Sequence, residues 1–400
     1  MNSPRSEAAD AEAHLSRGAV DCLPGGELAR KLALARHEGR PLRVKLGIDP
    51  TAPDIHLGHT VVLQRLRDFQ DAGHTVVLII GDYTARVGDP SGRSATRPVL
   101  APEEIDRNAQ TFQDQAFTII DRDRVEVRRN GEWLDMGADD LFRLVRTTTV
   151  AKILERDDFA NRYAAHEPIS ILELLYPLLQ AYDSVAIRAD VELGGTDQKF
   201  NLLLGRDIQR AYGQPEQAVM TMPILPGIDG VRKMSKSLGN HIAVTDPADE
   251  MFGKTLRLPD EAMPTWFELL LREPAPADTP ARDAKRALAR ALVTRFHGAA
   301  AAAAAEAHFD RLHIERRAPD DVEESAFGAE DGAVHMPALL ADTFGISRSE
   351  ARRLLQQGGV RLNGDALGPG DQDLAPERLD GAVLQIGKRR FRRMRRSGRA

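Results

Sequence analysis

The sequence predicts an α/β fold built on a parallel sheet, followed by a helical segment and a small basic α+β domain at the end of the chain. Three observations lead to this prediction: a strand, loop, helix and strand in succession near the N-terminus, helical periodicity after Asn240, and an excess of positive charge after Val334. The chain has 400 residues, which is enough for two or three domains, each with its own hydrophobic core.

Composition excludes several classes of protein. No apolar run reaches the roughly 18 residues that a membrane helix needs. Residues 1–14 are polar and alanine-rich, and they lack the basic and apolar regions of a signal peptide. The one cysteine, Cys22, excludes an intrachain disulfide and a cysteine cage for zinc. We therefore expect a cytoplasmic protein.

Charge is unevenly distributed along the chain. The formal net charge is −6, yet the residues from Val334 onward carry 13 Lys and Arg against 7 Asp and Glu. This balance of +6 leaves −12 for everything before Val334. Attraction to phosphate is therefore expected mainly at the C-terminal end.

The N-terminal part reads as strand, loop, helix and strand. Residues 1–40 are expected to contain one helix, at 27–37. An apolar run at 42–48 predicts a strand, and a β-branched run at 75–80 predicts a second one. Between them, apolar residues recur at i, i+4 and i+7 from Val62, as in an amphipathic helix.

Two histidines, His56 and His59, stand where this helix begins. In such a unit the loop lies at the carboxyl edge of the sheet, and the helix N-terminus favours anions through its backbone N–H groups and its dipole. Phosphate binding is one interpretation. A metal-binding pair and ordinary loop polarity are the alternatives that these residues leave open.

A second signature, Lys233-Met-Ser-Lys-Ser237, stands about 170 residues further on. An isolated Lys-x-x-Lys is typical of a solvated turn, but all five positions are present here. Together with His-x-Gly-His, this segment resembles the class I aminoacyl-tRNA synthetases, in which the two elements jointly hold ATP. The resemblance implies that His56 and His59 contact the phosphates and that Lys233 and Lys236 contact the departing pyrophosphate. It also places five further residues at the nucleotide: Asp49, Thr51, Gly58, Met234 and Ser235.

The segment Gly88-Asp-Pro-Ser-Gly92 resembles the tyrosyl enzymes within this class. By that resemblance Asp89 binds tyrosine, and Arg93 and Arg97 assist at the triphosphate. A surface turn rich in glycine and proline is the alternative.

A predicted helix carries three polar residues at i, i+4 and i+7: Tyr176, Gln180 and Asp183. Ser170 and Glu173 have the spacing of a capping box at its start. A helix with its polar face in water would have the same spacing. The pattern Tyr-x-x-x-Gln-x-x-Asp, however, resembles the segment with which tyrosyl-tRNA synthetases hold the amino acid.

Residues 191–198 read as a strand, a glycine turn and a helix start. By resemblance Gly195 and Asp197 contact the nucleotide, and Gln198 contacts the substrate tyrosine. A plain turn followed by a helix cap is the alternative. A further strand is expected at 220–225, leading to the loop that carries Lys233.

The region 102–159 is predicted to be mostly helical, with an extended piece at 125–128 and Trp133 at a turn. In the family this insertion builds much of a symmetric dimer interface, so a homodimer is expected. After Asn240 the pattern is helical again, including a stretch at 283–313.

The end of the chain resembles the S4 RNA-binding module over residues 347–364. Ser347 and Glu350 are predicted to cap a helix, and Asn363-Gly364 is predicted to form a hairpin turn. Three arginines near the start of this helix are expected to bind tRNA: Arg348, Arg352 and Arg353. A basic tail follows at 388–399.

The resemblance implies a Rossmann-like catalytic domain, a helical domain and an S4 domain. The expected boundaries are 1–240 with a helical insertion around 102–160, 241–317, a linker at 318–333, and 334–400. The implied reaction converts L-tyrosine and ATP to tyrosyl-adenylate and pyrophosphate, and then transfers tyrosine to the 3′ end of tRNA(Tyr). ATP is expected with Mg²⁺, without a tightly bound cofactor and without a dedicated metal site.

One position departs from the family. Many tyrosyl enzymes have a tyrosine two residues before Gly-x-Asp-Pro, where it contacts the substrate phenol, but this chain has Lys45. We therefore expect Asp183 to carry more of the hydroxyl recognition and Lys45 to pair with a carboxylate.

Three other functions compete with this interpretation. A tryptophanyl-tRNA synthetase is disfavoured by the Tyr176, Gln180 and Asp183 pattern and by the S4 segment. A non-enzymatic RNA-binding protein is disfavoured by the complete histidine and lysine signatures. An adenylyltransferase for a small acid would need no RNA-binding end.

Overall fold

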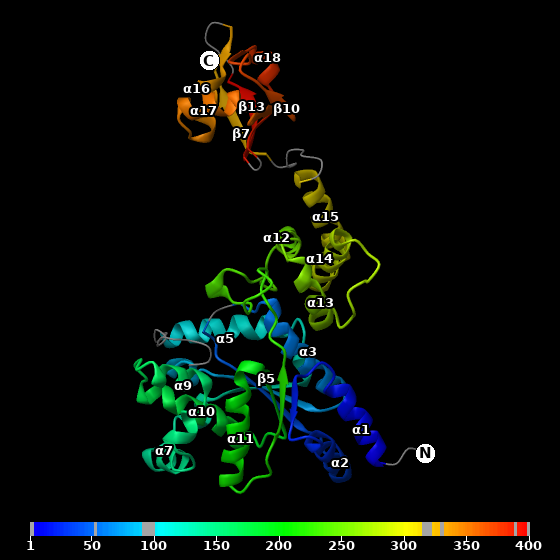
Figure 1. Cartoon of the computed structure of the whole chain (residues 1–400), viewed down its shortest axis with the longest axis vertical. Helices are drawn as coiled ribbons and strands as arrows, with labels where there is room; N and C mark the ends of the chain where they lie inside the picture. The colour runs from blue at the N-terminus through cyan, green and yellow to red at the C-terminus, as the bar shows by residue number, and fades with distance from the viewer. Residues whose placement is uncertain are drawn as a thin grey trace. The chain divides into compact units, whose positions relative to one another are not determined.

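The structure is a computed structural model, and it describes residues 4–51, 54–89, 101–313, 322–328, 332–387 and 390–397 (Figure 1). Arg93 and Arg97 lie outside these ranges. The chain divides into two compact units, residues 1–247 with 254–291, and residues 248–253 with 292–400.

The strands up to residue 222 are β1 (Asp21–Leu23), β2 (Arg43–Ile48), β3 (Thr75–Ile80), β4 (Val125–Arg129), β5 (Val191–Gly195) and β6 (Ala218–Met222). The α-helices of the same region are α1 (Pro4–Leu15), α2 (Glu27–Glu38), α3 (Leu57–Asp71), α4 (Thr84–Val87), α5 (Pro102–Ala116), α6 (Gly131–Leu134), α7 (Ala138–Val145), α8 (Val150–Ile153), α9 (Asp157–Ala164), α10 (Ile171–Ala186) and α11 (Lys199–Ala211). Short 3-10 turns lie at Arg122–Arg124 and Thr196–Gln198.

These strands form one sheet in the order β1-β6-β5-β2-β3-β4. All neighbouring pairs are parallel except β1 with β6. The chain moves outward from β2 through β3 to β4, and it then returns to place β5 on the other side of β2. This reversal is a topological switch point, where α/β sheets bind ligands outside the carboxyl ends of their strands. The predicted parallel-sheet fold is confirmed.

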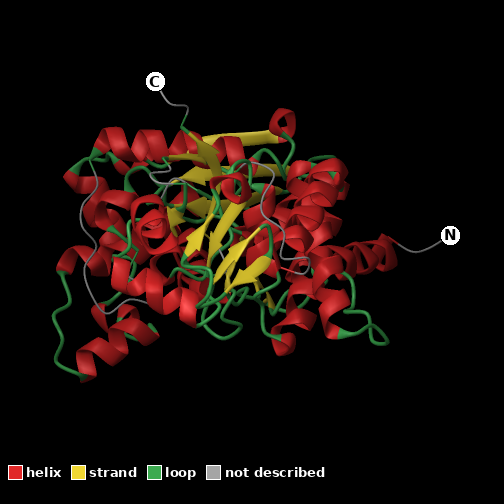
Figure 2. Cartoon of the chain, turned by 90° about the horizontal axis from the view of Figure 1, so that it is seen from above, coloured by secondary structure: helices red, strands yellow, loops and turns green. Residues whose placement is uncertain are grey.

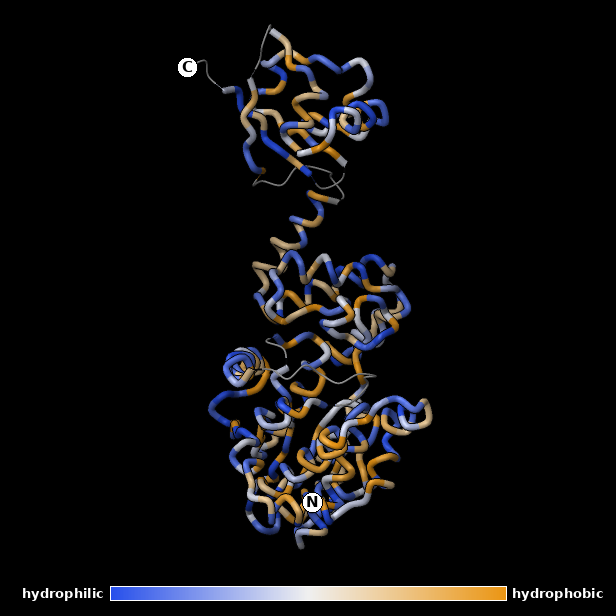
Figure 3. Tube along the Cα trace, turned by 90° about the vertical axis from the view of Figure 1, so that its left-hand side faces the viewer, coloured by the Kyte–Doolittle hydropathy of each residue, from blue (hydrophilic) through white to orange (hydrophobic). Residues whose placement is uncertain are grey.

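Both faces of this sheet are covered by helices, as Figure 2 shows. Strands buried on both faces become almost continuously apolar, and β3 has five buried residues out of six. Apolar stretches accordingly run through the unit in Figure 3. This is why the run at 75–80 could be recognised from sequence with its correct ends.

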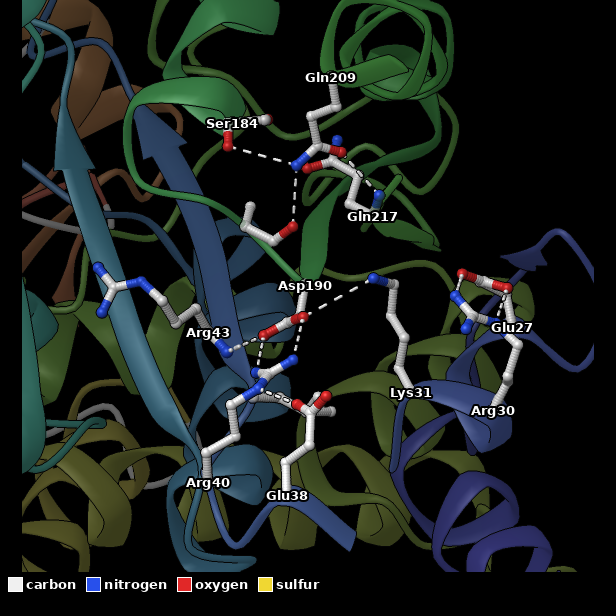
Figure 4. A network of polar contacts seen from close by, with 12 residues as sticks. Glu27, Arg30, Lys31, Glu38, Arg40, Arg43, Ser184, Asp190, Gln209 and Gln217 are labelled. Carbon is white, nitrogen blue, oxygen red and sulfur yellow. Dashed lines mark hydrogen bonds and ion pairs between the residues drawn. The ribbon is translucent and has the colours of Figure 1, made fainter. Parts of the chain in front are cut away.

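A polar network holds α2 against the amino end of β5 (Figure 4). Asp190 accepts hydrogen bonds from Arg40 Nη1 at 2.7 Å and from the backbone N–H of Arg43 at 3.0 Å. The ammonium group of Lys31, which is buried, lies 3.7 Å from the same carboxylate. The network joins a helix to a strand that begins about 160 residues later in the chain.

Several predicted boundaries need correction. The first 40 residues contain two helices and a strand rather than one helix, because α1 is polar and alanine-rich without an apolar stripe and β1 is too short to show an alternating pattern. The strand expected at 220–225 is β6, which begins at Ala218 and ends at Met222, where its pairing with β5 ends. The extended piece at 125–128 is β4, an edge strand of the sheet. Trp133 lies within α6 rather than at a turn.

From residue 236 to 313 the structure is helical, as predicted. The elements are a 3-10 turn (Lys236–Leu238), α12 (Ala248–Thr255), a 3-10 turn (Asp260–Ala262), α13 (Met263–Trp266), a π-helical turn (Phe267–Leu271), α14 (Ala281–His297) and α15 (Ala299–His313). The stretch predicted at 283–313 is two helices, because Gly298 adopts a φ of 87° that interrupts the helix.

The C-terminal residues form a five-stranded sheet in the order β10-β9-β12-β13-β7 and a two-stranded sheet of β11 and β8. Its strands are β7 (Glu324–Phe327), β8 (Val334–His335), β9 (Val360–Leu362), β10 (Asp365–Leu367), β11 (Asp373–Leu374), β12 (Val383–Ile386) and β13 (Arg390–Arg396). The helices are α16 (Met336–Phe344), α17 (Arg348–Gln356) and α18 (Pro376–Leu379). A shared core of 17 buried residues joins these elements.

The hairpin predicted for this region is confirmed, and the predicted helix cap is confirmed for Ser347. Ser347 Oγ accepts a hydrogen bond from the Glu350 N–H at 3.1 Å and so caps α17, whereas the Glu350 carboxylate lies 3.9 Å from Arg353. Asn363 and Gly364, with φ of 52° and 95°, connect β9 to β10 as a hairpin.

Two other predictions for it are wrong. Part of the expected linker is strand β7, and most of the expected basic tail is strand β13, which pairs with β7 in parallel. The shortness of β7 and the five arginines of β13 concealed these strands. Arg392 pairs with Glu323 at 2.6 Å and Arg395 with Glu324 at 3.3 Å, so opposite charges meet across the pair.

Candidate functional site

The two signatures predicted to bind ATP meet at the carboxyl edge of the sheet. Backbone hydrogen bonds run from the Leu57 N–H to Ile242 O and from the Val244 N–H to Ile55 O, both at 2.9 Å. The first signature is thereby joined to the segment that directly follows Lys233–Ser237.

Gly58 allows this approach. A β-carbon at Gly58 would lie 3.0 Å from two ring atoms of His56 and 3.7 Å from the Cβ of Met234. A side chain at this position would therefore crowd the His56 ring, while its β-carbon would be in ordinary contact with Met234.

His56 is the N-cap residue of α3, and His59 lies in its first turn. The ring centroids are 3.9 Å apart, and the His56 N–H donates to His59 Nδ1 at 3.2 Å. His56 Nδ1 has no hydrogen-bond partner within the described ranges. Burial lowers the pKa of both imidazoles, that of His56 to about 2 with help from the neighbouring His59. Both rings are therefore neutral at pH 7 and act through N–H groups and lone pairs rather than as cations.

The two signature lysines are held by carboxylates from other segments. Lys236 Nζ lies 2.6 Å from Asp54 Oδ2, and Lys233 Nζ lies 3.3 Å from Asp197 Oδ2. The hydrogen bond from Lys236 lowers the pKa of Asp54. The lysines thus sit next to the histidine segment and next to the end of β5, as both predicted roles require.

Asp49 connects β2 to the predicted tyrosine helix. Its Oδ2 accepts a hydrogen bond from the phenol of Tyr176 at 2.9 Å, and its Oδ1 accepts from Thr84 Oγ1 at 2.7 Å. Burial, with a contribution from the Asp49 charge, raises the pKa of Tyr176 well above 10. The phenol therefore stays protonated as a donor.

Asn201 is the centre of a second group of hydrogen bonds. Its amide nitrogen donates to Gln180 Oε1 at 2.8 Å and to Gln198 Oε1 at 3.1 Å. Gln198 Nε2 donates to Asp89 Oδ2 at 3.0 Å, and Arg156 Nη2 lies 3.3 Å from Asp89 Oδ1. Three residues predicted to bind tyrosine are thus connected, although they come from three different segments.

Asp183 is buried on the same helix. Trp133 Nε1 donates to its Oδ1 at 2.8 Å, and Asn130 Nδ2 lies 3.5 Å from its Oδ2. Burial raises the pKa of Asp183 to about 6, against the opposing effect of the Lys45 charge and of the Trp133 hydrogen bond. The carboxylate is therefore mainly ionised at pH 7, but it titrates within a physiologically relevant range.

Lys45 pairs with a carboxylate, as expected from sequence. Its Nζ lies 2.9 Å from Glu192 Oε1, and both side chains are buried.

One expectation about α10, the helix that carries Asp183, is wrong. Ser170 caps it, but Glu173 does not complete a capping box, because its carboxylate pairs with Arg162 at 2.7 Å.

The remaining predicted residues lie close to these groups in the chain. Thr51 forms a turn through its N–H to Asp49 O at 2.8 Å. Gly195 ends β5, and Ser235 Oγ is 2.9 Å from Ser237 Oγ. Sequence reasoning missed five polar partners: Asp54, Asn130, Trp133, Arg156 and Asn201. Only Asn201 had a usable signal, since it follows Gln198 by one helical turn.

The arginines predicted to bind RNA are exposed on α17. Arg348 and Arg352 have no ion pair within the part of the chain that the structure describes, and Arg353 lies 3.9 Å from Glu350. These groups are available to an anionic partner, unlike Arg392 and Arg395 of β13, which pair with glutamates.

Comparisons with known proteins show the family to which the chain belongs. Residues 37–313 match the model of the family "tRNA synthetases class I (W and Y)", and residues 339–372 match the S4 domain. The tyrosine–tRNA ligase of Geobacter sulfurreducens is 49% identical over 399 residues, covering 96% of this chain and 98% of the relative. That of Moorella thermoacetica is 49% identical over 393 residues, covering 95% and 94%.

Solved structures agree on the fold. The tyrosyl-tRNA synthetase of Archaeoglobus fulgidus, solved with L-tyrosine, superposes with a TM-score of 0.61 at 22% identity, covering 74% of this chain and 99% of that one. The enzyme of Aeropyrum pernix gives 0.59 at 21% identity, covering 75% and 98%. With a family model over most of its length and near-full-length relatives of one kind, the chain belongs to the class I tRNA synthetases, in the tyrosine–tRNA ligase family.

Proposed function

We propose that the protein is a tyrosine–tRNA ligase, which activates L-tyrosine with ATP and then esterifies tRNA(Tyr). The observation that carries the proposal is the juxtaposition, at one switch point of the sheet, of the two ATP signatures and a buried carboxylate, Asp183. An amino acid without a side-chain hydroxyl would not need an ionised carboxylate at this place.

ATP would bind across the first turn of α3. The N–H groups of that turn and the neutral imidazoles of His56 and His59 suit phosphate oxygens. Lys233 and Lys236 would exchange their carboxylate partners, Asp197 and Asp54, for the β- and γ-phosphates. This exchange supplies positive charge only when the polyphosphate is in place.

Tyrosine would lie between α10 and the end of β5. Its hydroxyl would donate to Asp183, while the oxygens of Asp89 and Gln180 suit the α-ammonium group. Tyr176 and Gln198 would line the same site, and Asp49, held by Tyr176, would face the ribose or the reacting carboxylate.

The first step forms a bond between a carboxylate oxygen of tyrosine and the α-phosphorus of ATP, and it breaks the bond to pyrophosphate. In the second step a hydroxyl of the tRNA 3′ end attacks the tyrosyl carbonyl, and AMP departs. Neither step needs a covalent enzyme intermediate. Positioning of the reactants and donors aimed at the developing negative charge account for catalysis of this type.

Magnesium is expected to arrive with ATP. Among the described residues, no three His, Cys, Asp or Glu side chains are grouped so that they could hold a metal ion. The phosphates would therefore supply the ligands, and no step above depends on a protein-bound metal. Arg93 and Arg97 remain proposed triphosphate contacts from sequence.

The RNA would contact the S4 domain, with Arg348, Arg352 and Arg353 at its phosphates. We propose a catalytic domain over 1–240, a helical domain over 241–317, and an RNA-binding domain that begins with β7 rather than at residue 334. In the described part of the chain no helix is long and apolar enough to cross a membrane. We expect the enzyme to work in the cytoplasm, with its tRNA.

A homodimer is part of the proposal. Large apolar side chains are exposed along one continuous part of the chain: Phe142, Val145, Val150, Tyr163, Ile171 and Leu172. Exposed apolar side chains concentrated in this way mark interaction surfaces. A second copy of the chain would cover them.

The test is ATP–pyrophosphate exchange with each of the twenty amino acids, followed by tRNA charging. Exchange that depends on tyrosine, together with charging of tRNA(Tyr), is the expected result. Exchange with tryptophan instead would assign the protein to the other branch of its family. Absence of exchange with every amino acid would refute enzymatic activation altogether.

A further inference from the structure

Lys45 lies on β2 directly opposite Glu192 of β5 in the parallel register. Its side chain is 0% exposed and that of Glu192 is 1% exposed. Residues paired in register project from the same face of the sheet, so both side chains point toward α10. A salt bridge is thereby placed in the interior, directly beneath the helix that carries the proposed tyrosine contacts.

All three hydrogens of the Lys45 ammonium group have an acceptor. Nζ lies 2.9 Å from Glu192 Oε1, 2.9 Å from the backbone oxygen of Gln180 and 2.9 Å from Ser184 Oγ. An ammonium group donates three hydrogen bonds and no more, so Lys45 has none left for a ligand. Lys45 therefore cannot replace the phenol-contacting tyrosine of related enzymes by direct contact.

Two of these three acceptors belong to α10 and lie one helical turn apart. Gln180 precedes Asp183, and Ser184 follows it. Lys45 therefore fixes both the distance of this turn of α10 from the sheet and its rotation about the helix axis. This turn carries the Asp183 carboxylate.

The second carboxylate oxygen of Glu192 also has hydrogen-bond donors. Glu192 Oε2 accepts hydrogen bonds from Ser184 Oγ at 3.0 Å and from Gln217 Nε2. Replacing a buried ion pair with well-packed apolar side chains is often neutral or stabilising. Stability alone therefore does not account for this pair, and its position beneath Asp183 suggests another purpose.

Charged groups reach Asp183 from two elements, with Lys45 on β2 and Glu192 on β5. The phenol of Tyr176 on α10 stays protonated and neutral, and the neighbouring Asn130 and Trp133 are neutral donors. Lys45 is the one cation among them. We infer that Lys45 is a positioning residue for tyrosine specificity, which keeps the Asp183 carboxylate oriented and ionised so that it accepts the substrate hydroxyl.

This inference rests on the proposed function and deepens it. An ionised carboxylate accepts a stronger hydrogen bond than a neutral acid does. The Asp183 pKa of about 6 lies close enough to neutrality for the loss of one neighbouring charge to matter. With the Lys45 charge the enzyme would select tyrosine at pH 7, and without it the enzyme would do so only under alkaline conditions.

The experiment measures kcat/KM in ATP–pyrophosphate exchange for tyrosine and for phenylalanine, from about pH 5 to about pH 8. Phenylalanine lacks the hydroxyl. The ratio of kcat/KM for tyrosine to kcat/KM for phenylalanine therefore reports recognition of the hydroxyl, because groups that titrate but do not contact the hydroxyl affect both substrates alike. In the wild type the ratio should fall as pH falls through about 6, by up to about tenfold per pH unit.

Two single substitutions should displace this fall in opposite directions. Lys45→Met removes the neighbouring cation, so the fall should move to higher pH, by about one pH unit or more. Glu192→Gln removes an anion and keeps hydrogen-bonding atoms, so the fall should move to lower pH. A purely structural ion pair would be broken equally by both changes, and both would then act in the same direction.

Lys31→Met is the matched control. Lys31 is also a buried lysine near a carboxylate, Asp190, but that pair lies at the amino end of β5 (Figure 4). This variant should leave the position of the fall unchanged.

A folding defect in Lys45→Met would not prevent the test. The double variant Lys45→Met with Glu192→Gln removes both charges of the pair, so neither Lys45 nor Glu192 is left as a buried charge without its partner. Its ratio should still fall at a higher pH than in the wild type, because Lys45 affects the pKa of Asp183 more strongly than Glu192 does.

The outcomes separate the two levels of inference. A wild type that shows no tyrosine-dependent exchange would overturn both the function and the role of Lys45. A wild type that prefers tyrosine, with single variants whose ratios both shift the same way or do not shift, would overturn the role of Lys45 alone.

Discussion

The indole Nε1 of Trp133 donates a hydrogen bond of 2.8 Å to Asp183 Oδ1. The two residues are 50 positions apart, and Trp133 comes from the region inserted between two strands of the sheet. A contact of this kind makes the insertion part of the proposed substrate site as well as of the proposed dimer surface.

We predict that Trp133→Phe reduces discrimination between tyrosine and phenylalanine. The ring remains, but the donor that favours the ionised carboxylate is lost, and hydrogen bonds to charged groups contribute about 1.5 to 3 kcal/mol. The kcat/KM ratio should therefore fall roughly tenfold or more. The control is Trp266→Phe at the other tryptophan. The indole of Trp266 donates to Pro226 O at 3.1 Å and not to Asp183. Equal ratios in the two variants would contradict the assignment.

We predict that Asp183→Asn stabilises the protein above pH 6 while it removes tyrosine selectivity. Between pH 3.8 and about 6 the folded carboxyl is protonated whereas the unfolded one is ionised, so stability falls as pH rises through this window and stays low above it. The pKa difference corresponds to about 3 kcal/mol. Urea unfolding at about pH 4 and about pH 8 measures it. The free energy of unfolding of Asp183→Asn, relative to the wild type, should be larger at about pH 8 than at about pH 4. An equal difference at both values would show that burial does not raise the pKa of Asp183.

We predict that His59→Ala and Lys236→Ala lower the rate of adenylate formation without unfolding the protein. Groups aimed at charge that develops in the transition state contribute about 2.7 to 4 kcal/mol each, so kcat should fall about 100- to 1,000-fold. Single-turnover formation of tyrosyl-adenylate is the measurement. Lys285→Ala is the control, because Lys285 also pairs with a carboxylate, Asp260, but carries no proposed role. Normal rates in the two site variants would remove these residues from the phosphate site.

We predict that a chain ending at His313 folds and keeps tyrosine-dependent exchange but loses most of its tRNA charging. The residues after it have their own core, and the proposed tyrosine and phosphate contacts all precede Asn240. Replacing Arg348, Arg352 and Arg353 together by serine should reproduce part of the loss. It should also flatten the salt dependence of tRNA binding by up to about 0.9 per lost contact. Unchanged charging and salt dependence would show that the RNA binds elsewhere.

We predict that Phe142→Asp with Val150→Asp weakens self-association. These side chains are 60% and 63% exposed in the single chain, and a charge within a dimer interface would be buried without a partner. Sedimentation velocity over a range of concentrations measures the change. Val20→Asp is the control, since Val20 is 57% exposed but lies outside the insertion. The same association in both proteins would place the interface on another surface.

The sequence by itself determined the class of fold and most of the candidate site. The strands at 42–48 and 75–80 were readable because burial on both faces makes a parallel strand almost wholly apolar. The two signatures were readable because phosphate binding needs particular residues at short, fixed spacings within one loop or helix turn. The helix with Tyr176, Gln180 and Asp183 followed from its period, which is also a local property.

Only the tertiary structure decided which distant groups meet. Trp133 reaches Asp183, Asn201 joins Gln180 to Gln198, and Lys45 meets Glu192, through contacts between segments that no local period can reveal. Strands β7 and β13 were hidden for a related reason, because each is a strand through its pairing with the other, which lies about 70 positions away in the chain. Periodicity reports which face of an element is buried, whereas the partner of a buried charge is chosen by the three-dimensional arrangement of elements far apart in the chain.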